Sequence, residues 1–121
     1  MAEPYSPFSK DLQDVVGQRL SMVVFVMDYW QLGFNEHHFN VYSSIAVAGP
    51  GWRVRDGEPG FRDRLCERLT YIVAAVSRCA DGLTFSFDDG SLIEISMREA
   101  DYVGPEAFEY RSPNSGRMYV G

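Results

Sequence analysis

The sequence has few cysteines, a single lysine and no long apolar run, and these shortages exclude several classes of protein. Two cysteines, Cys66 and Cys79, are too few for the disulfide framework of a small secreted protein, so we expect two reduced, buried thiols. No apolar stretch approaches the roughly 18 residues of a membrane-spanning helix. Residues 1–4 lack the basic-then-apolar order of a signal peptide. We therefore expect a cytoplasmic protein that does not bind to a membrane.

The sequence also lacks the motifs of common catalytic, metal and phosphate sites. It contains no nucleophile motif and no glycine-rich phosphate loop. The adjacent His37 and His38 would point to opposite faces of a strand, and no further ligands follow at zinc-like spacing. Residues 88–90, Asp-Asp-Gly, are typical of a tight turn and lack the spacing of a calcium loop. We expect no metal, no cofactor and no enzymatic activity.

Negative charge is concentrated late in the chain. The net charge is −6, from 17 acidic and 11 basic residues. Residues 81–109 hold eight acidic residues and one basic residue, a net charge of −7. Such a segment repels nucleic acid and attracts a basic protein surface. A nucleic-acid site would need more positive charge, so we expect these arginines to pair with the acidic segment instead: Arg53, Arg55, Arg62, Arg64 and Arg68.

The residues that are abundant predict a folded domain of short strands. Apolar residues make up 45% of the chain and aromatic residues 14%, which is typical of a globular protein. Residues 20–27 are apolar on both faces, as in an interior strand, and residues 30–34 and 39–47 alternate like half-buried strands. Residues 10–17 and 61–69 have helical spacing. Residues 70–79 fit either an extension of the second helix or another strand.

The two halves of the chain resemble each other at an offset of 53 positions. This offset places Leu12 on Leu65, Trp30 on Leu83 and Phe34 on Phe87. It favours a strand at residues 70–79, as the equivalent of residues 20–27. We predict an α+β fold that is mainly antiparallel β, with two three-stranded meanders and short helices, and with an internal duplication as one explanation of the repeat. The single domain of residues 1–121 would comprise a first half (10–48), a second half (61–98) and a C-terminal segment (99–121).

Two hairpins are predicted, one in the second half and one in the C-terminal segment. A three-residue turn at residues 88–90 pairs Phe85 with Ile93 on a buried face, with Gly90 in the left-handed region. A two-residue turn would instead place Phe85 opposite Glu94 and bury a charge. Residues 108–110 and 118–120 are expected to pair through a Pro-Asn-Ser-Gly turn at residues 113–116.

The run from Leu83 to Ile95, which alternates around the turn at residues 88–91, is followed by Gly104-Pro105-Glu106-Ala107. Together they resemble small bacterial proteins of unknown function, some of which are similar to immunity proteins of polymorphic toxin systems. The resemblance covers roughly residues 61–110, with a weaker similarity at residues 12–47. It implies a non-enzymatic, cytoplasmic, protein-binding role and assigns no catalytic residues.

The favoured hypothesis is a small acidic binding protein that acts as an immunity protein by occluding a toxin. Acidic side chains would speed association with a basic partner, and aromatic side chains would slow dissociation. The candidate partner-binding residues are Asp88, Asp89, Glu94, Glu106, Glu109, Tyr110 and Tyr119. Two alternatives stay open. One is a structural or homodimeric module joined through sheet edges, and the other is a small-ligand binder or enzyme with a pocket near His37, His38 and Trp30.

Overall fold

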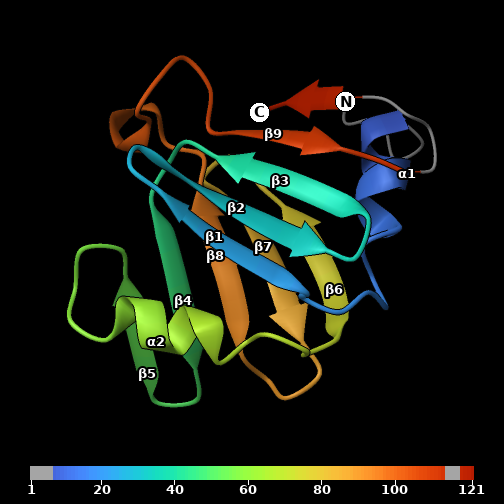
Figure 1. Cartoon of the computed structure of the whole chain (residues 1–121). Coiled ribbons are helices and arrows are strands. Elements are labelled where there is room, and N and C mark those ends of the chain that lie inside the picture. The colour runs from blue at the N-terminus through green and yellow to red at the C-terminus, as the bar shows by residue number, and fades with distance from the viewer. Residues whose placement is uncertain (1–6, 114–117) are drawn as a thin grey trace.

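The computed structural model describes residues 7–113 and 118–121, and it consists of two five-stranded antiparallel sheets packed face to face (Figure 1). The first sheet has the order β1-β2-β3-β9-β10 and the second the order β5-β4-β8-β7-β6. The first sheet is built from β1 (Met22–Val26), β2 (Tyr29–Phe34), β3 (His37–Val41), β9 (Phe108–Arg111) and β10 (Met118–Val120). The second is built from β4 (Ile45–Gly49), β5 (Trp52–Arg55), β6 (Val73–Arg78), β7 (Gly82–Phe87) and β8 (Leu92–Ser96). The mainly antiparallel β class is therefore confirmed.

Each sheet has more strands than the three that were predicted. Strands β1, β2 and β3 pair in sequence order within the first sheet, and β6, β7 and β8 do so within the second. Strand β9 pairs with β3 and extends the first sheet, and β4 pairs with β8 and extends the second. The prediction of one strand at residues 39–47 is therefore wrong, because β3 and β4 divide this segment between the two sheets. The alternation within each strand gave no information about these pairings between distant segments.

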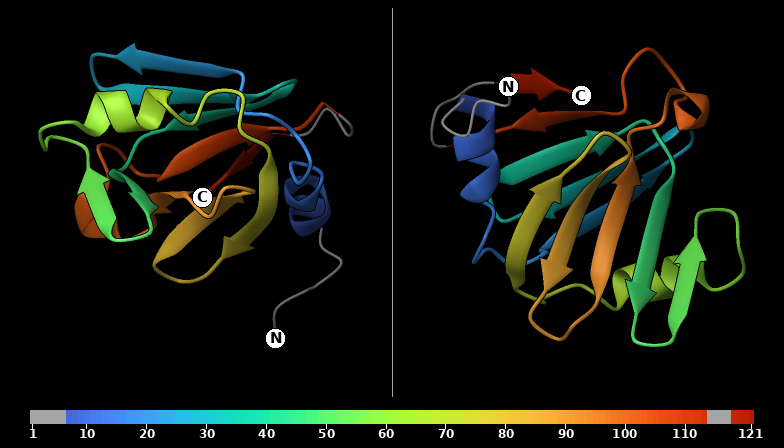
Figure 2. Two further views of the ribbon diagram at one scale, coloured as in Figure 1. Left: turned by 90° about the horizontal axis from the view of Figure 1, so that it is seen from below. Right: turned by 180° about the vertical axis from the view of Figure 1, so that it is seen from behind.

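Short helices lie at opposite ends of the sandwich (Figure 2). Helix α1 (Pro7–Gln13) contacts β6, and helix α2 (Phe61–Cys66) contacts β4 and β5. The apolar residues Leu12, Phe61 and Leu65 of these helices are buried in the core. A 3₁₀ helix, η1 (Glu99–Asp101), follows β8. No helix of the described residues crosses the outer face of either sheet, so both faces are available for contacts (Figures 1 and 2).

The core lies between the sheets and is rich in aromatic rings. Phe34 of the first sheet stacks on Phe85 of the second with ring centroids 4.8 Å apart, and Phe39 meets Phe85 at 5.1 Å. Phe85 pairs with Ile93 across β7 and β8, and both side chains are fully buried. Gly90 has φ = 90°, the left-handed conformation expected in this turn. The predicted register of the β7–β8 hairpin is confirmed.

Strand β1 is an edge strand, so the prediction of an interior strand at residues 20–27 is wrong. It pairs only with β2, and all of its residues are half-buried. Val23 and Phe25 pack against the core, whereas the alternate residues face outward. Met27, at the end of the run, is 96% exposed. An apolar run on both faces therefore does not distinguish a covered strand from an edge strand with an apolar outer face.

Residues 70–79 contain the strand that the repeat favoured. Strand β6 begins three residues after Thr70, whose φ of 77° is unusual for a β-branched residue. The Thr70 amide donates to the carbonyl of Leu20 at 2.7 Å, and the Leu20 amide donates to the carbonyl of Tyr71 at 3.0 Å. These bonds place residues 17–20 beside residues 70–73 and cover part of the β6 edge.

The two remaining predictions concern the last hairpin, which is confirmed, and the burial of the cysteines, which is not. Strands β9 and β10 pair with Tyr110 opposite Tyr119, which confirms the last hairpin, although most of its predicted turn at residues 113–116 lies outside the described residues. Cys66 and Cys79 are free but exposed, so the prediction that both are buried is wrong. Cys66 ends α2 beside the buried Leu65, and one helical position is enough to turn its side chain toward solvent.

Candidate partner-binding surface

The turn between β7 and β8 presents Asp88 and Asp89 in different ways. Both residues are exposed, and the Asp88 amide donates to the carbonyl of Ile72 at 3.0 Å. The Asp89 carboxylate accepts hydrogen bonds from the amide (2.9 Å) and the hydroxyl of Ser91. Partial burial would raise the pKa of Asp89, but the Ser91 hydrogen bonds and the nearby Arg68 charge lower it below its ordinary value. Asp89 therefore holds the turn in shape.

Arg68 ties this turn to the end of α2. Its side chain is buried, with the guanidinium 5.5 Å from the ring centroid of Trp52 and 5.0 Å from that of Tyr71. It lies 3.6 Å from the Asp89 carboxylate and 3.2 Å from that of Glu67. A buried guanidinium needs such carboxylates nearby. The Asp89–Arg68 pair is thus part of the folded structure, and a partner would have to break it to use Asp89.

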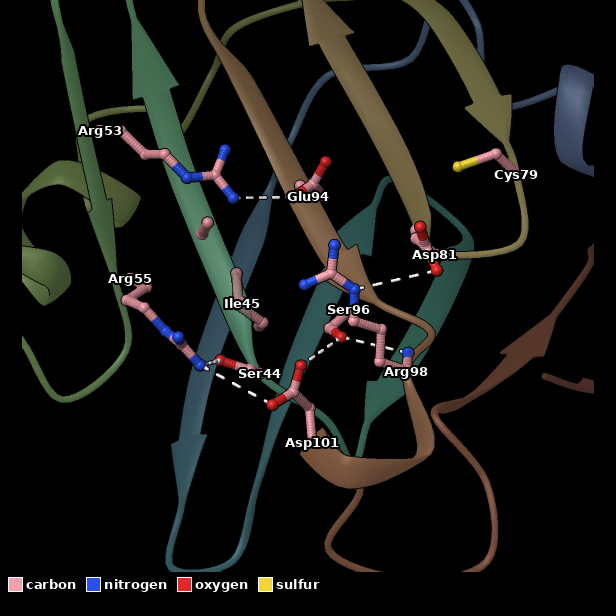
Figure 3. A pocket seen from close by; sticks show the side chains of 12 residues that line it. Ser44, Ile45, Arg53, Arg55, Cys79, Asp81, Glu94, Ser96, Arg98 and Asp101 are labelled. Atoms are coloured by element: carbon pink, nitrogen blue, oxygen red, sulfur yellow. Dashed lines mark hydrogen bonds and ion pairs between the residues drawn. The ribbon is translucent and has the colours of Figure 1, made fainter.

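Glu94 lies on the outer face of the second sheet, in a polar hollow of about 200 Å³ that we call the arginine groove (Figure 3). Small residues of the sheet, Ala46, Gly82 and Ser96, form part of its lining. Arg53 donates to Glu94 at 2.8 Å. The groove also holds two looser pairs, Arg55–Asp101 at 3.9 Å and Arg98–Asp81 at 3.8 Å. Each carboxylate of the arginine groove therefore has a guanidinium of the same chain beside it.

The predicted pairing of arginines with the acidic segment is confirmed for three of the five. Arg53, Arg55 and Arg68 meet acids from residues 81–109. Arg64 instead approaches Glu67 at 3.4 Å and stacks over Trp52. Arg62 stacks over the ring of Phe25 at 5.0 Å. Both of these residues belong to α2, and they contact neighbours at their own end of the sandwich.

Glu109 lies on β9 of the other sheet, and Glu106 lies in the loop that precedes this strand; both are near Tyr42. The Glu109 carboxylate accepts a hydrogen bond from the Tyr42 hydroxyl and a longer one, 3.4 Å, from the side-chain amide of Asn40. The bond to Glu109 raises the pKa of Tyr42 to about 12, and partial burial adds to the shift. The Tyr42 hydroxyl is therefore protonated at neutral pH and holds Glu109 in place.

A mainly apolar hollow of about 240 Å³, which we call the tyrosine pocket, opens next to this pair. The rings of Tyr29 and Tyr42 are 5.4 Å apart and tilted by 49°. The other lining residues are Asp28, Val103, Gly104, Pro105 and Glu106. The lining of the pocket thus combines two tyrosine residues with two acidic residues.

The loop that follows η1 builds one wall of the tyrosine pocket. The Val103 amide donates to the carbonyl of Tyr42, and the Tyr42 amide donates to the carbonyl of Ala107, both at 2.7 Å. The chain between these two bonds is therefore held around Tyr42. It contains the Gly104-Pro105-Glu106-Ala107 element that the sequence made prominent.

Tyr110 and Tyr119 point inward and attach α1 to the first sheet. The Tyr110 side chain is fully buried, and its hydroxyl donates to the carbonyl of Asp11 at 2.8 Å. The same hydroxyl lies 2.8 Å from Nδ1 of His37, and the Tyr119 hydroxyl donates to the Asp11 carboxylate. Burial raises the pKa of Tyr110. Tyr110 belongs to the core, and its side chain is not on the surface of the folded chain.

The two histidines lie on opposite faces of β3, as adjacent strand residues should. His37 is buried, which lowers its pKa, and His38 is exposed. Trp30 lines a different hollow, of about 470 Å³, together with Phe61 and Arg62. Within the described residues, no single hollow brings together the three residues of the predicted small-ligand pocket.

The seven predicted partner-binding residues thus fall in separate places. Asp88 and Asp89 lie at a hairpin turn, Glu94 on the outer face of the second sheet, and Glu106 and Glu109 beside the tyrosine pocket. Sequence reasoning missed Asp28, Tyr29 and Tyr42, which come from the less acidic half. A usable signal existed, because Tyr29 immediately precedes an alternating strand at a position that faces outward.

The chain matches no known family model, no curated protein and no solved structure. Among residues 7–113 and 118–121, no group of three or more histidine, cysteine, aspartate or glutamate residues is placed to hold a metal ion. In this part of the chain, none of the helices combines the length and the apolar character that a membrane span requires.

Proposed function

We propose that this protein is a non-enzymatic, cytoplasmic binding protein whose tyrosine pocket takes a lysine or arginine side chain of a basic protein partner. The observation that carries the proposal is the arrangement of Tyr29 and Tyr42 with the carboxylates of Asp28 and Glu106 around one hollow. A toxin with a basic cleft is a partner of this kind. Occlusion of such a cleft would make the protein an immunity protein.

The chemistry of the tyrosine pocket fits a long basic side chain. Aromatic faces attract a cation through their quadrupole, and the methylene stem of lysine or arginine packs well on apolar walls. Carboxylates in the lining add a charge interaction with the head of the side chain. No arginine or lysine of this chain lines the pocket within the described residues, in contrast to the arginine groove. The net charge of −6 favours approach of a basic protein.

The direct test is an NMR titration with a short capped peptide that carries one arginine between glycine and serine residues. We expect saturable shifts at Tyr29, Tyr42 and Glu106, and weaker binding when norleucine replaces arginine, because norleucine keeps the apolar stem without the charge. Glu106→Gln and Asp28→Asn should each weaken binding by about 0.5–1 kcal/mol, the value of a partly exposed charge interaction.

Two further variants separate the pocket from general charge effects. Glu99→Gln removes an exposed acid of η1 outside the pocket and should leave affinity unchanged. Tyr42→Phe keeps the ring and should bind, whereas Tyr42→Ala should not. If the arginine peptide binds no better than its glutamate counterpart, or binds Tyr42→Ala equally well, the proposal fails.

A homodimer is the second candidate, because strand β1 offers an unprotected sheet edge. Its sequence, Met-Val-Val-Phe-Val, contains no charged residue or proline, the usual protections of an edge strand. Two copies could pair through β1 and continue the sheet. Sedimentation equilibrium distinguishes the candidates: a dimer that Val24→Lys converts to a monomer supports this function, and a monomer at all concentrations rejects it.

We also propose that the repeat in the chain reflects an internal duplication. The offset of 53 positions places the six residues of β2 on the six residues of β7, and α1 on α2 to within one residue. The order of one helix and three strands occurs in both halves. The test is a chain in which residues 61–98 replace residues 10–48. If it unfolds cooperatively, the halves are equivalent, and if it does not fold, they are not.

A further inference from the structure

A second hollow adjoins the tyrosine pocket and shares one wall with it. This hollow, which we call the Ser43 hollow, has a volume of about 420 Å³. Asp28, Tyr29 and Val103 line both hollows. The Ser43 hollow is formed where the β1–β2 turn, the chain between β3 and β4, the end of β5 and the segment around η1 come together. The two hollows are therefore neighbours on either side of Tyr29.

The Ser43 hollow is lined by a buried hydroxyl that has no partner. Ser43 is 4% exposed, and its Oγ makes no hydrogen bond within the described residues. The next residue is fully engaged, because Ser44 donates its hydroxyl proton to Asp56 and accepts a hydrogen bond from Arg55 at 3.0 Å. Buried hydroxyl groups are normally hydrogen-bonded. Ser43 is therefore an unpartnered polar residue in the wall of the hollow.

The charge of the Ser43 hollow favours a cation. Three carboxylates line it, from Asp28, Asp56 and Asp101, against the single guanidinium of Arg55. Asp101 accepts a hydrogen bond from the Ser96 hydroxyl at 2.6 Å through one oxygen. Its other oxygen is 3.9 Å from Arg55, which is beyond hydrogen-bond distance. Arg55 thus neutralises Asp101 only loosely, and a closer cation could displace it.

We propose that the Ser43 hollow is a second subsite for the same partner, and that it takes a second basic side chain from the segment whose first basic side chain occupies the tyrosine pocket. In this arrangement Asp101 receives the second charge in place of Arg55, and the Ser43 hydroxyl hydrogen-bonds to the partner. The ligand is then an extended segment with two basic residues. This inference rests on the proposed function, because the tyrosine pocket supplies the first contact.

The experiment compares capped peptides that carry one arginine with peptides that carry two, separated by one, two, three or four glycine residues. Affinities are measured by NMR titration of the whole protein at low salt. Linking two contacts raises affinity only when the spacer matches the distance between the sites. We expect one spacing to bind about tenfold more tightly than the one-arginine peptide, and the others to bind only slightly better.

Variants that should lower or raise the affinity gain of the two-arginine peptide identify the second subsite. Asp101→Asn should abolish the tenfold gain and leave the affinity of the one-arginine peptide unchanged. Arg55→Gln removes the resident cation and should increase the gain, a result that a damaged fold cannot produce. Ser43→Ala should reduce the gain a few-fold, and Glu99→Gln, in the same 3₁₀ helix as Asp101, is the matched control without effect.

The one-arginine and two-arginine peptides distinguish failure of the tyrosine pocket from failure of the second subsite. Failure of the one-arginine peptide to bind rejects the proposed function of the tyrosine pocket. If that peptide binds but no spacing gives a gain, the second subsite does not exist and the tyrosine pocket stands alone. A gain that persists at full size in Asp101→Asn also overturns the inference, because the second arginine then binds elsewhere.

Discussion

On the outer face of the second sheet, the carboxylates of Asp81 and Glu94 each have an arginine of the same chain within 4 Å, whereas Asp101, in η1, lines both the arginine groove and the Ser43 hollow. On the opposite side of the molecule, Glu109 is held by the Tyr42 hydroxyl, and Glu106 lines an aromatic hollow. Both groups come from one acidic stretch of the sequence. The sandwich divides this stretch between two faces and gives the carboxylates different neighbours.

This difference shows that the number of acidic side chains on a surface does not by itself determine whether it can bind a cation. The neighbouring groups that already neutralise those side chains matter more. A carboxylate that is paired with an arginine must give up that pair before it can bind a cationic partner. Within the described residues, Glu106 and Glu109 have no arginine or lysine partner to give up, although a cation that binds Glu109 competes with its hydrogen bond from Tyr42. We therefore expect the side with the tyrosine pocket to be the better surface for a basic partner, although three acidic residues line the arginine groove and only two line the tyrosine pocket.

The largest effect is expected from a substitution of Phe85, which packs between the two sheets. Phe85 touches Phe34 and Phe39 of the opposite sheet, so Phe85→Ala should lower the free energy of unfolding by about 3–5 kcal/mol. Thr84→Ala, on the outer face of the same strand, should change it by less than about 0.5 kcal/mol. Urea denaturation of both variants provides the measurement. Equal losses would show that β7 does not have a buried and an exposed face.

A smaller effect distinguishes the two acids of the β7–β8 turn. Asp89→Ala should cost about 1–2 kcal/mol of unfolding free energy, because it removes the hydrogen bonds to Ser91 and one counter-charge of the buried Arg68. Asp88→Ala, at the exposed neighbouring position, should cost less than about 0.5 kcal/mol. Thermal unfolding at neutral pH measures both. If the two variants are equally stable, Asp89 does not hold the turn.

The alternation of apolar residues was sufficient to predict β7, β8 and the register of their hairpin, whereas β6 was favoured only by the repeat. Phe85 and Ile93 had to share a face, because a one-residue shift would have buried Glu94. The position of a strand within its sheet was not predictable in the same way. The apolar run at residues 20–27 shows which residues lie on the two faces of this strand. Whether the strand lies at an edge of the sheet depends on which segments far along the chain pair beside it.

The candidate surface was less predictable for the same reason. Glu94 and Glu109 are close in the sequence, yet they lie on different sheets. Tyr29 and Tyr42 are separated by 12 intervening residues and meet only because β2 and β3 are neighbours in the first sheet. The Gly104–Ala107 element was prominent in the sequence, but its contact with Tyr42 could be seen only in the folded chain.

A gradual, pH-dependent effect should distinguish the inner and outer faces of β3. Burial lowers the pKa of His37 below its ordinary value of 6.5, so the unfolded chain binds a proton more readily than the folded chain. The contribution of His37 to stability is therefore complete above pH 6.5 and is lost as the pH falls toward the lowered pKa. Unfolding free energies between pH 8 and pH 5 should decrease in the wild type, and His37→Gln should make this decrease smaller. His38→Gln is the matched control on the exposed face, and an unchanged slope in His37→Gln would contradict the prediction.

The smallest expected effect tests whether the pairs in the arginine groove are as weak as their exposure implies. Arg53 and Glu94 are in contact at 2.8 Å, but both side chains are more than one-third exposed. Water and salt screen such a pair, so a double-mutant cycle with Arg53→Gln and Glu94→Gln should give a coupling of about 0.2–1 kcal/mol. The coupling should fall further in 1 M salt, where the screening length is about 3 Å. A coupling above about 2 kcal/mol that resists salt would mean that the groove is rigidly neutralised. A coupling within the expected range would leave Arg53 able to exchange partners, and the contrast between the two faces would then be one of degree.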